Sequence, residues 1–428
     1  MATKLGGFST GTMTSKPQIQ IPIDESICGF IFDIGPRNDV FSKYPKAKDY
    51  FENGQVQCIN NIKEAINLGI YEYGILSGVP YYHIKQFYDY IGHDVKLYVM
   101  FADVVNSSID NSPFEIMLVE SNCEVFQIGV WTEANIFNKS GNDIVFSDMI
   151  SNIHSMSQQI KGSSETPTAY PSAVNVIVCG GLGAGNLHRG DIDYRNLPDC
   201  TEMDYELISI LLGECAKEVS VLPIANDAQV GMLGIAMACL SLCSAENSIA
   251  CVKDFNLNKN DTFPNAKLGL GTDGTNIADI NRIQASILAL KGYIFPTTYD
   301  AKEGGMYLCS DSTMTIGNWG TISGNRIVDR LRRIVRKALL PMINGRIVFD
   351  KNMDNISQAS VTEINNLIKE AIDTYMINAD GQPQLSAYSV TIDTYQPNAK
   401  NDQIEIGFAF AYLESENIIN FVERYNTK

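Results

Sequence analysis

Apolar runs and helical segments alternate along the middle of the chain, and this alternation restricts the fold more than any other feature. Three of the runs are VKLYVMFAD, VFQIGVW and VNVIVCGG, at residues 95–103, 125–131 and 174–181. Segments with helical periodicity lie between them, at residues 113–121 and 143–161. Strands that are apolar on both faces and are joined by helices form parallel sheets with helices on both sides. The sequence therefore predicts an α/β body with a mainly parallel sheet.

The segments on either side extend this pattern. Two helices are predicted between residues 60 and 92, because aromatic and aliphatic residues recur there every three or four positions. His83 and His93 are expected at the surface or at the end of these helices. A capping pair, Thr201 and Asp204, indicates that another helix begins near residue 201. The predicted elements that follow are this helix at 201–219, a strand at 219–227, a helix at 230–243 and a strand at 248–252.

A polar, turn-rich stretch at residues 254–290 indicates a connection between two bodies. The remainder of the chain is expected to be α+β, with a basic helix, a second helix at residues 360–378 and closing strands. The predicted division of the chain is an extended arm at 1–24, an α/β domain at 25–270, an α+β domain at 271–402 and C-terminal strands at 403–428.

Acidic residues outnumber basic ones by 49 to 32, which gives a formal net charge of −17. Nucleic acids and anionic membranes repel such a surface, so neither is an expected partner. The first residues lack a secretory signal pattern, and no apolar run approaches the roughly 18 residues that a membrane span needs. The ten cysteines are spread through apolar segments without a CxxC pair, and the chain has only four histidines. We therefore expect reduced core thiols and no metal site.

Glycines after the predicted strand at 174–181 resemble a nucleotide site, but the third glycine and the following helix are missing from VIVCGGLGAGN. Asp103, Gly180 and Asp227 lie at predicted strand ends, where open α/β sheets bind ligands, so an α/β enzyme is the alternative function. His188, Asp191 and Asp193 share one loop and are expected to be solvated. Because no spaced set of nucleophile, base and orienting group occurs, no catalytic residue and no cofactor are predicted.

The segment NRIVDRLRRIVRKALL, residues 325–340, predicts a helix with six basic residues and one acid. Two neighbouring stripes run along it, because both step by four, three and four positions. The apolar stripe is expected to face the core, and the cationic stripe to face an acidic partner, since like charges at helical contact distance repel one another. A merely solubilising role of these charges is the alternative. The cationic stripe consists of Arg326, Arg330, Arg333 and Lys337.

Both ends of the chain are rich in β-forming residues. The C-terminal segment QIEIGFAFAY alternates apolar residues with small ones, and another strand follows it. Such strands present edges that a neighbouring subunit can pair with, although they can equally complete the sheet of their own subunit. The residues expected to exchange between subunits are Ile19, Ile21, Ile23, Ile418, Ile419, Phe421, Val422 and Tyr425.

In order, these segments resemble contractile tail sheath proteins of phages and phage-like injection machines, particularly a sheath family frequent in prophages. The similarity is carried by residues 219–257, GYIFPTTYD, residues 325–350, YSVTIDTYQ and the final strands. The resemblance implies an outer α/β body and an inner α+β domain whose basic helix meets an acidic tube. It implies a non-enzymatic subunit with copies of itself, an acidic inner tube protein, and baseplate and terminator proteins as partners.

The resemblance also implies assembly in the bacterial cytoplasm and a final place in the tail of a virion or injection particle. The large surface insertions of some sheath proteins are absent from this sequence. A non-contractile or type VI-like sheath component is a further alternative.

Overall fold

The computed structural model describes residues 25–36, 40–161, 174–181, 194–215, 230–258, 266–267, 282–299, 305–342, 348, 355–377, 383–396, 403–412 and 419–426. The chain divides into two compact units. The α/β unit comprises Asp24–Ser157 and Val174–Asn325, and the α+β unit comprises Met1–Ile23, Gln158–Ala173 and Arg326–Lys428.

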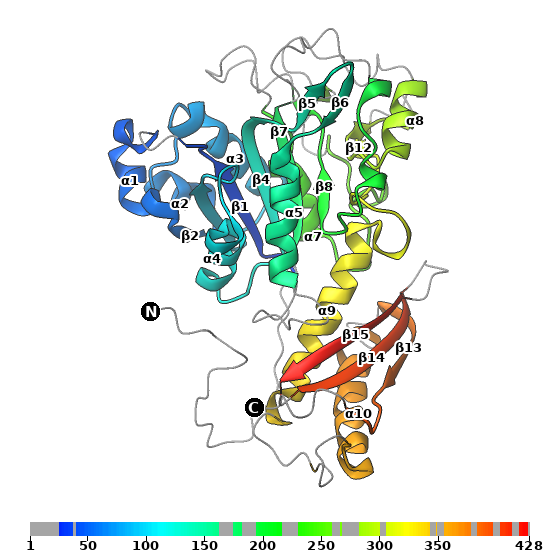
Figure 1. Ribbon diagram of the computed structural model, residues 1–428. Coiled ribbons are helices and arrows are strands. Elements are labelled where there is room, and N and C mark those ends of the chain that lie inside the picture. Colours follow the sequence, from blue (N-terminus) through cyan, green and yellow to red (C-terminus); the bar gives the residue numbers. More distant parts are fainter. Residues whose placement is uncertain are drawn as a thin grey trace. The chain divides into compact units, whose positions relative to one another are not determined.

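A six-stranded sheet forms the centre of the α/β unit (Figure 1). Its neighbouring strands are parallel, except that β2 runs antiparallel to β3 at one edge. The predicted mainly parallel sheet is therefore confirmed. In sheet order the strands are β2 (Val56–Ile59), β3 (Leu97–Ala102), β1 (Cys28–Asp33), β4 (Gln127–Asn135), β7 (Asn175–Gly181) and β8 (Ile208–Ile210).

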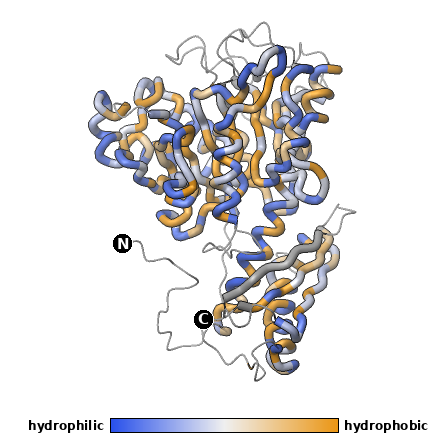
Figure 2. Tube along the Cα trace, in the orientation of Figure 1, coloured by the Kyte–Doolittle hydropathy of each residue, from blue (hydrophilic) through white to orange (hydrophobic). Residues whose placement is uncertain are grey.

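Helices cover both faces of this sheet (Figure 1). A Cβ atom on Gly29 of β1 would lie 3.3 Å from the Met117 side chain of α4 (Pro113–Glu120). On the opposite face, a Cβ on Gly129 of β4 would lie 3.0 Å from Leu233 and Met237 of α7 (Leu233–Leu242). Apolar residues are accordingly concentrated along the strands (Figure 2). The other helices of this region are α1 (Pro45–Phe51), α2 (Ile62–Asn67), α3 (Val79–Ile91) and α5 (Asp148–Lys161).

The helix expected at residues 201–219 is wrong, because the structure forms strand β8 there. Residues 208–210 pair with β7, and the Val176 amide donates to the Leu207 carbonyl at 2.7 Å. The hydrogen bonds of the sheet thus override a local helical pattern. The expected capping pair is also wrong, since Asp199 accepts from the Thr201 amide at 2.9 Å. The strand expected at 248–252 is a series of turns instead.

Residues beyond the predicted domain boundary at 270/271 still belong to the α/β unit. The amide of Leu212 donates to the carbonyl of Ile294 at 2.8 Å, and the Met314 amide donates to the Ile208 carbonyl at 2.7 Å. These bonds attach residues 294 and 314 to the segment around β8, and the chain divides between Asn325 and Arg326. The remaining elements of this unit are β5 (Phe137–Ser140), β6 (Asp143–Phe146), β9 (Glu214–Cys215), β10 (Ala266–Lys267), α8 (Arg282–Leu290), β11 (Pro296–Thr297) and β12 (Tyr307–Leu308).

The α+β unit combines an antiparallel three-stranded sheet with two helices. Its sheet order is β13-β14-β15, with β14 paired to both neighbours. Ser357 caps α10 by accepting from the Ser360 amide at 3.2 Å, and a π-helical turn, Asp373–Ile377, ends it. The elements are α9 (Ile322–Leu339), which begins in the α/β unit, α10 (Gln358–Ile372), β13 (Leu385–Thr391), β14 (Gln403–Tyr412) and β15 (Ile419–Asn426).

Candidate interface on helix α9 and the terminal strands

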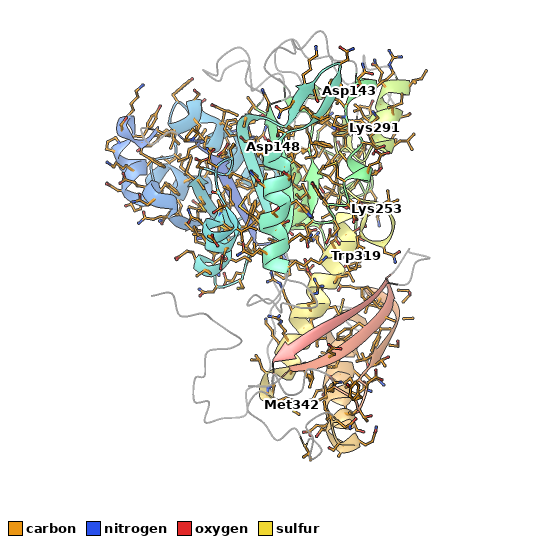
Figure 3. The ribbon with its side chains drawn as sticks, viewed as in Figure 1. Asp143, Asp148, Lys253, Lys291, Trp319 and Met342 are labelled. Carbon is orange, nitrogen blue, oxygen red and sulfur yellow. The ribbon has the colours of Figure 1, made fainter. Side chains whose placement is uncertain are left out.

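Helix α9 has one apolar side and one strongly charged side. It runs between Trp319 and Met342, which are labelled in Figure 3. The residues of the predicted apolar stripe are each at most 3% exposed, so this prediction is confirmed. They are Ile327, Leu331, Ile334 and Ala338.

The four residues of the predicted cationic stripe do not form one exposed surface. Arg326 and Arg333 are only 2% and 6% exposed, whereas Arg330 and Lys337 are partly exposed. Burying a guanidinium is unfavourable unless hydrogen bonds or opposite charges compensate, so the two buried arginines serve the fold of this chain. This corrects the expectation that all four side chains line the surface.

Arg330 holds the C-terminal end of the second helix of the unit. Its Nη2 atom donates to the carbonyl of Tyr375 at 3.3 Å, in the π-helical turn that ends α10. Carbonyls at the end of a helix lack partners within the helix, and a cation there also interacts favourably with the helix dipole. Arg330 therefore already has a hydrogen-bond partner within its own chain.

Two further basic residues of α9 are partly exposed, and the sequence reasoning missed them. Arg332 and Arg336 lie on the far side of the polar face from Arg330, one helical turn apart. Their spacing of four positions was visible in the sequence, but they fall outside the stripe that runs parallel to the apolar one. The partly exposed basic residues of α9, here called the α9 cationic surface, are Arg330, Arg332, Arg336 and Lys337.

Asp329 is the acid among these charges and is only 2% exposed. Burial raises its pKa to about 6, while the positive charges of Arg332, Arg333 and Lys161 oppose that shift. The Nη1 atom of Arg332 lies 3.5 Å from Asp329 Oδ1, which is long for a charge-assisted hydrogen bond. Lys337 responds in the opposite sense, since burial and the charge of Arg333 lower its pKa.

The terminal strands are placed by the sheet of the α+β unit. Ile419, Phe421, Val422 and Tyr425 lie in β15, whose backbone pairs with β14 of the same chain from Gln403↔Asn426 to Phe410↔Ile419. The structure thus shows the own-sheet arrangement that the sequence left open, and exchange between subunits stays a prediction. Ile19, Ile21, Ile23 and Ile418 lie outside the described residues.

Strand β14 has one buried and one partly exposed side. Its apolar residues are at most 4% exposed, in the alternation that the sequence predicted. On the other side, Gly407 pairs with Thr391 and Ala409 pairs with Ser389, so this face is built from small side chains. The buried residues are Ile404, Ile406, Phe408 and Phe410.

An α/β enzyme, the alternative function, would bind its ligand at the strand ends of the α/β unit. A buried acid that the sequence reasoning missed lies there and forms hydrogen bonds within the chain. The strand order reverses at β1, and Asp33 ends this strand with 4% exposure. Asp33 Oδ1 accepts from the amides of Val104 at 2.9 Å and Gly35 at 3.1 Å, and Oδ2 accepts from Thr132 Oγ1 at 2.6 Å. Burial raises the pKa of Asp33, and these hydrogen bonds oppose the shift.

Of the residues that the sequence singled out near these strand ends, the structure describes Gly180 and Asp103, and both make local contacts. A Cβ on Gly180 would lie 2.7 Å from Thr132 Cγ2, so side-chain packing already occupies that space. Asp103 accepts from the amide and side chain of Asn106 in a local turn. Asp227, His188, Asp191 and Asp193 lie outside the described residues. Among the residues that the structure describes, no group of three His, Cys, Asp or Glu side chains could hold a metal ion.

His83 is buried, which corrects its expected place at a helix surface. Its Nδ1 accepts from the Gly234 amide at 3.2 Å, so Nε2 carries the proton and donates to the Val230 carbonyl at 2.8 Å. Trp131 Nε1 donates to the same carbonyl at 2.9 Å. Burial lowers the pKa of His83 to about 3, so the ring is neutral and links α3, β4 and the start of α7.

The expected core location holds for five of the described cysteines, Cys28, Cys179, Cys200, Cys239 and Cys243, which are buried. Cys58 is exposed, and Cys123, Cys251 and Cys309 are partly exposed, so the expectation is wrong for these four. Within the described part of the chain, none of the helices has the length and apolar character needed to cross a bilayer.

No protein-family model matches the chain, and no curated protein matches it either. Solved structures match it over almost its entire length. A sheath tail protein from Listeria innocua superimposes with a TM-score of 0.53 at 11% sequence identity, over 95% of this chain and 96% of that chain. The chain therefore has the fold of a sheath tail protein.

Two further solved structures match with TM-scores below 0.5 and carry no weight in the argument. One is a chain of the anti-feeding prophage baseplate, with a TM-score of 0.47 and 13% identity over 96% of this chain and 98% of that chain. The other is a sheath tail protein from Desulfitobacterium hafniense, with a TM-score of 0.48 and 10% identity over 98% of this chain and 100% of that chain.

Proposed function

We propose that this chain is a structural subunit of a contractile tail sheath, which polymerises helically around an inner tube and contracts to drive the tube through a target-cell envelope. The observation that carries the proposal is the fold similarity to the Listeria innocua sheath tail protein, which extends over nearly the whole of both chains. A shared fold by itself does not determine function, and the surface chemistry of this chain provides independent support.

The distribution of charge supports an acidic inner tube as the partner of the α+β unit. The α/β unit holds 35 of the 49 acidic and 17 of the 32 basic residues, a net charge of −18. The α+β unit holds the other 14 acidic and 15 basic residues, a net charge of +1. An acidic tube would be repelled by the first unit and would find the α9 cationic surface on the second, so charge alone orients the subunit.

Assembly of copies is supported by the strands of the α+β unit. Within the described residues, β13 and β15 are the outer strands of its sheet, and such edges pair readily with strands of another chain. An exchanged β15 could keep the β14 register seen here, with its partner strand supplied by a neighbour. Baseplate and terminator proteins would then cap the two ends of the cylinder.

Contraction requires two packings of one subunit and contacts that can be released. Head-to-tail interfaces that do not close generate a helical cylinder rather than a ring. Contacts between exposed charges contribute on the order of 0.2 to 1 kcal/mol per pair, so the tube contacts would break one by one while exchanged strands keep the lattice connected.

The test of self-assembly is negative-stain electron microscopy of the purified full-length chain. We expect long cylinders of uniform diameter. Removal of residues 419–428, which contain β15, should abolish long cylinders, and cylinders of normal length from the truncated chain would exclude strand exchange by β15. A monodisperse monomer of the intact chain at high concentration would refute the proposed function.

The test of the tube contact is co-expression with the tube protein. We expect the double variant Arg336→Glu and Lys337→Glu to form empty cylinders, because the α9 cationic surface loses four units of positive charge. The matched control is Lys369→Glu on α10, an exposed reversal outside α9. Tube-filled cylinders from the double variant would refute the electrostatic contact.

A further inference from the structure

Asp329 occupies an unusual place, as the single acid in a helix with six basic residues. Its residue exposure is 2%, so its carboxylate is taken out of water. Removing a carboxylate from water is costly unless strong hydrogen bonds replace the lost hydration. The fold therefore gains little from this acid, and its position next to basic residues of the proposed tube contact needs another reason.

The charged groups that act on Asp329 come from two helices. Arg332 and Arg333 follow it on α9, and Lys161 ends α5. Arg332 is the closest of the ion-pair partners described, with Nη1 at 3.5 Å from Asp329 Oδ1. Strong pairs between a guanidinium and a carboxylate have distances near 2.7–2.9 Å, so the pair between Arg332 and Asp329 is a long one.

Arg332 is also part of the α9 cationic surface, and its side chain is 12% exposed. It can therefore face either the carboxylate inside its own chain or a carboxylate on a partner. A side chain with two alternative partners binds each of them less tightly than it would bind one alone, because contact with one must be given up to reach the other.

We propose that Asp329 is an internal competitor for Arg332, which weakens the binding of an acidic partner to the α9 cationic surface and so keeps that contact releasable. This inference rests on the proposed function, because it concerns the regulation of the same surface. It assigns Asp329 a role in the affinity for the partner, separate from any role in the stability of the helix.

Mild acidification should remove this competition. The pKa of Asp329 is raised to about 6 by burial, whereas carboxylates on an exposed partner titrate near 4. As the pH falls from 7.5 to 5.5, Asp329 takes up a proton while a sulfated or exposed acidic partner keeps its charge. The affinity of the α9 cationic surface for such a partner should therefore increase over this interval.

The test uses the purified full-length chain and dextran sulfate, whose sulfate groups stay charged throughout, in low-salt buffer. At pH 7.5 we expect Asp329→Asn to bind about two- to fivefold more tightly than the wild type, the gain of one exposed ion pair. In an Arg332→Gln background the same substitution should change the affinity by less than about 1.5-fold. The control Asp393→Asn removes one exposed acid from the loop after β13 and should have little effect.

The pH arm compares the wild type with Asp329→Asn at pH 7.5 and at pH 5.5. The wild type should bind more tightly at pH 5.5 than at pH 7.5, and Asp329→Asn should show a smaller change, because every other titrating group is present in both proteins. Because the wild-type titration needs no variant, it also holds if Asp329→Asn folds poorly.

An unchanged affinity of Asp329→Asn at pH 7.5, or an equal gain in the two Arg332 backgrounds, would overturn the inference. Failure of the proposed tube contact has a different signature. In that case the variant with Arg336→Glu and Lys337→Glu would bind dextran sulfate as tightly as the wild type.

Discussion

Each of the two units contains a buried acid, and the two acids differ in how closely their partners contact the carboxylate. In the α/β unit, Asp33 accepts three hydrogen bonds of 2.6 to 3.1 Å from Thr132, Val104 and Gly35. In the α+β unit, Asp329 is as deeply buried but has Arg332 at 3.5 Å as its described ion-pair partner. A carboxylate with short hydrogen bonds to backbone amides fixes loops to one another, whereas a carboxylate whose described ion pair is long holds that partner less firmly.

This difference is consistent with the proposed function, in which the α+β unit contacts a partner. In the α/β unit, the buried rings of His83 and Trp131 donate to the main chain at 2.8 and 2.9 Å. The α+β unit instead carries the α9 cationic surface, one sheet face of small residues and strand β15. We therefore expect substitutions in the first unit to change stability, and substitutions in the second to change binding as well.

The largest effect is expected from Asp33→Ala. Loss of the carboxylate leaves the buried Val104 amide and Thr132 hydroxyl without their acceptor, which should lower the free energy of unfolding by about 3 kcal/mol or more. Both tryptophans, Trp131 and Trp319, lie in the α/β unit, so urea unfolding followed by tryptophan fluorescence reports on it. Asp33→Asn keeps one acceptor atom and should lower the free energy of unfolding by less than Asp33→Ala does. A loss below about 1 kcal/mol for Asp33→Ala would contradict the fastening role.

Asp329→Asn should raise the free energy of unfolding, whereas Asp33→Ala should lower it. The folded-state pKa of about 6 lies above the unfolded value, so the folded chain binds this proton more tightly, and stability falls as the pH rises through about 6. The neutral variant should therefore be more stable than the wild type by about 2 to 3 kcal/mol at pH 7.5, and by about half of that at pH 5. Circular dichroism at both pH values measures this, with Asp393→Asn, the loss of one exposed acid, as the control. A variant less stable than the wild type at pH 7.5 would show that the ionised pair supports the fold.

Gly129→Ala tests whether the larger sheet is covered tightly on its α7 side. The added methyl would lie 3.0 Å from Leu233 and Met237, closer than ordinary van der Waals contact. Overpacking of this kind should lower the free energy of unfolding by about 1 to 3 kcal/mol. Tryptophan fluorescence again gives the measurement, and an unchanged midpoint would mean that α7 can shift away from β4.

The smallest effect is expected from the matched change in the other sheet, Gly407→Ala. Its added methyl would meet only Thr391, at 3.6 and 3.7 Å, which is ordinary contact. Alanine in a strand interior is favoured over glycine, so stability should rise by about 0.5 kcal/mol. Circular dichroism on thermal unfolding checks this prediction. A loss comparable to that of Gly129→Ala would show that this face of β14 is covered as tightly as the larger sheet.

Much of the fold was predictable from the residues because apolar periodicity records which side of each element faces a core. The alternation in 403–412 gave the buried side of β14, and the spacing of Ile327, Leu331 and Ile334 gave the buried side of α9. The prediction of a helix at residues 201–219 was wrong for a different reason. Its helical pattern is local, while the strand that forms at Ile208–Ile210 depends on hydrogen bonds to β7, some 30 residues earlier.

The candidate interface was predictable only in outline. Sequence spacing located a cationic helix, but it grouped Arg326 and Arg333 with residues at the surface and passed over Arg332 and Arg336. No periodicity separates a charged residue that is covered from one that is exposed, because both lie on the polar side of the same helix. The place of Asp329 among them was visible in the sequence, but its burial was not.

The sequence by itself determined the layered α/β architecture, the apolar side of each regular element and the concentration of positive charge in one helix, because these follow from residue order within a single element. Tertiary structure alone decided that Asp33 is buried and hydrogen-bonded at the strand ends and that His83 is buried and neutral. It also decided which charged residues of α9 are buried. The physical reason is that desolvation depends on the segments that pack over a side chain, and those segments come from distant parts of the chain.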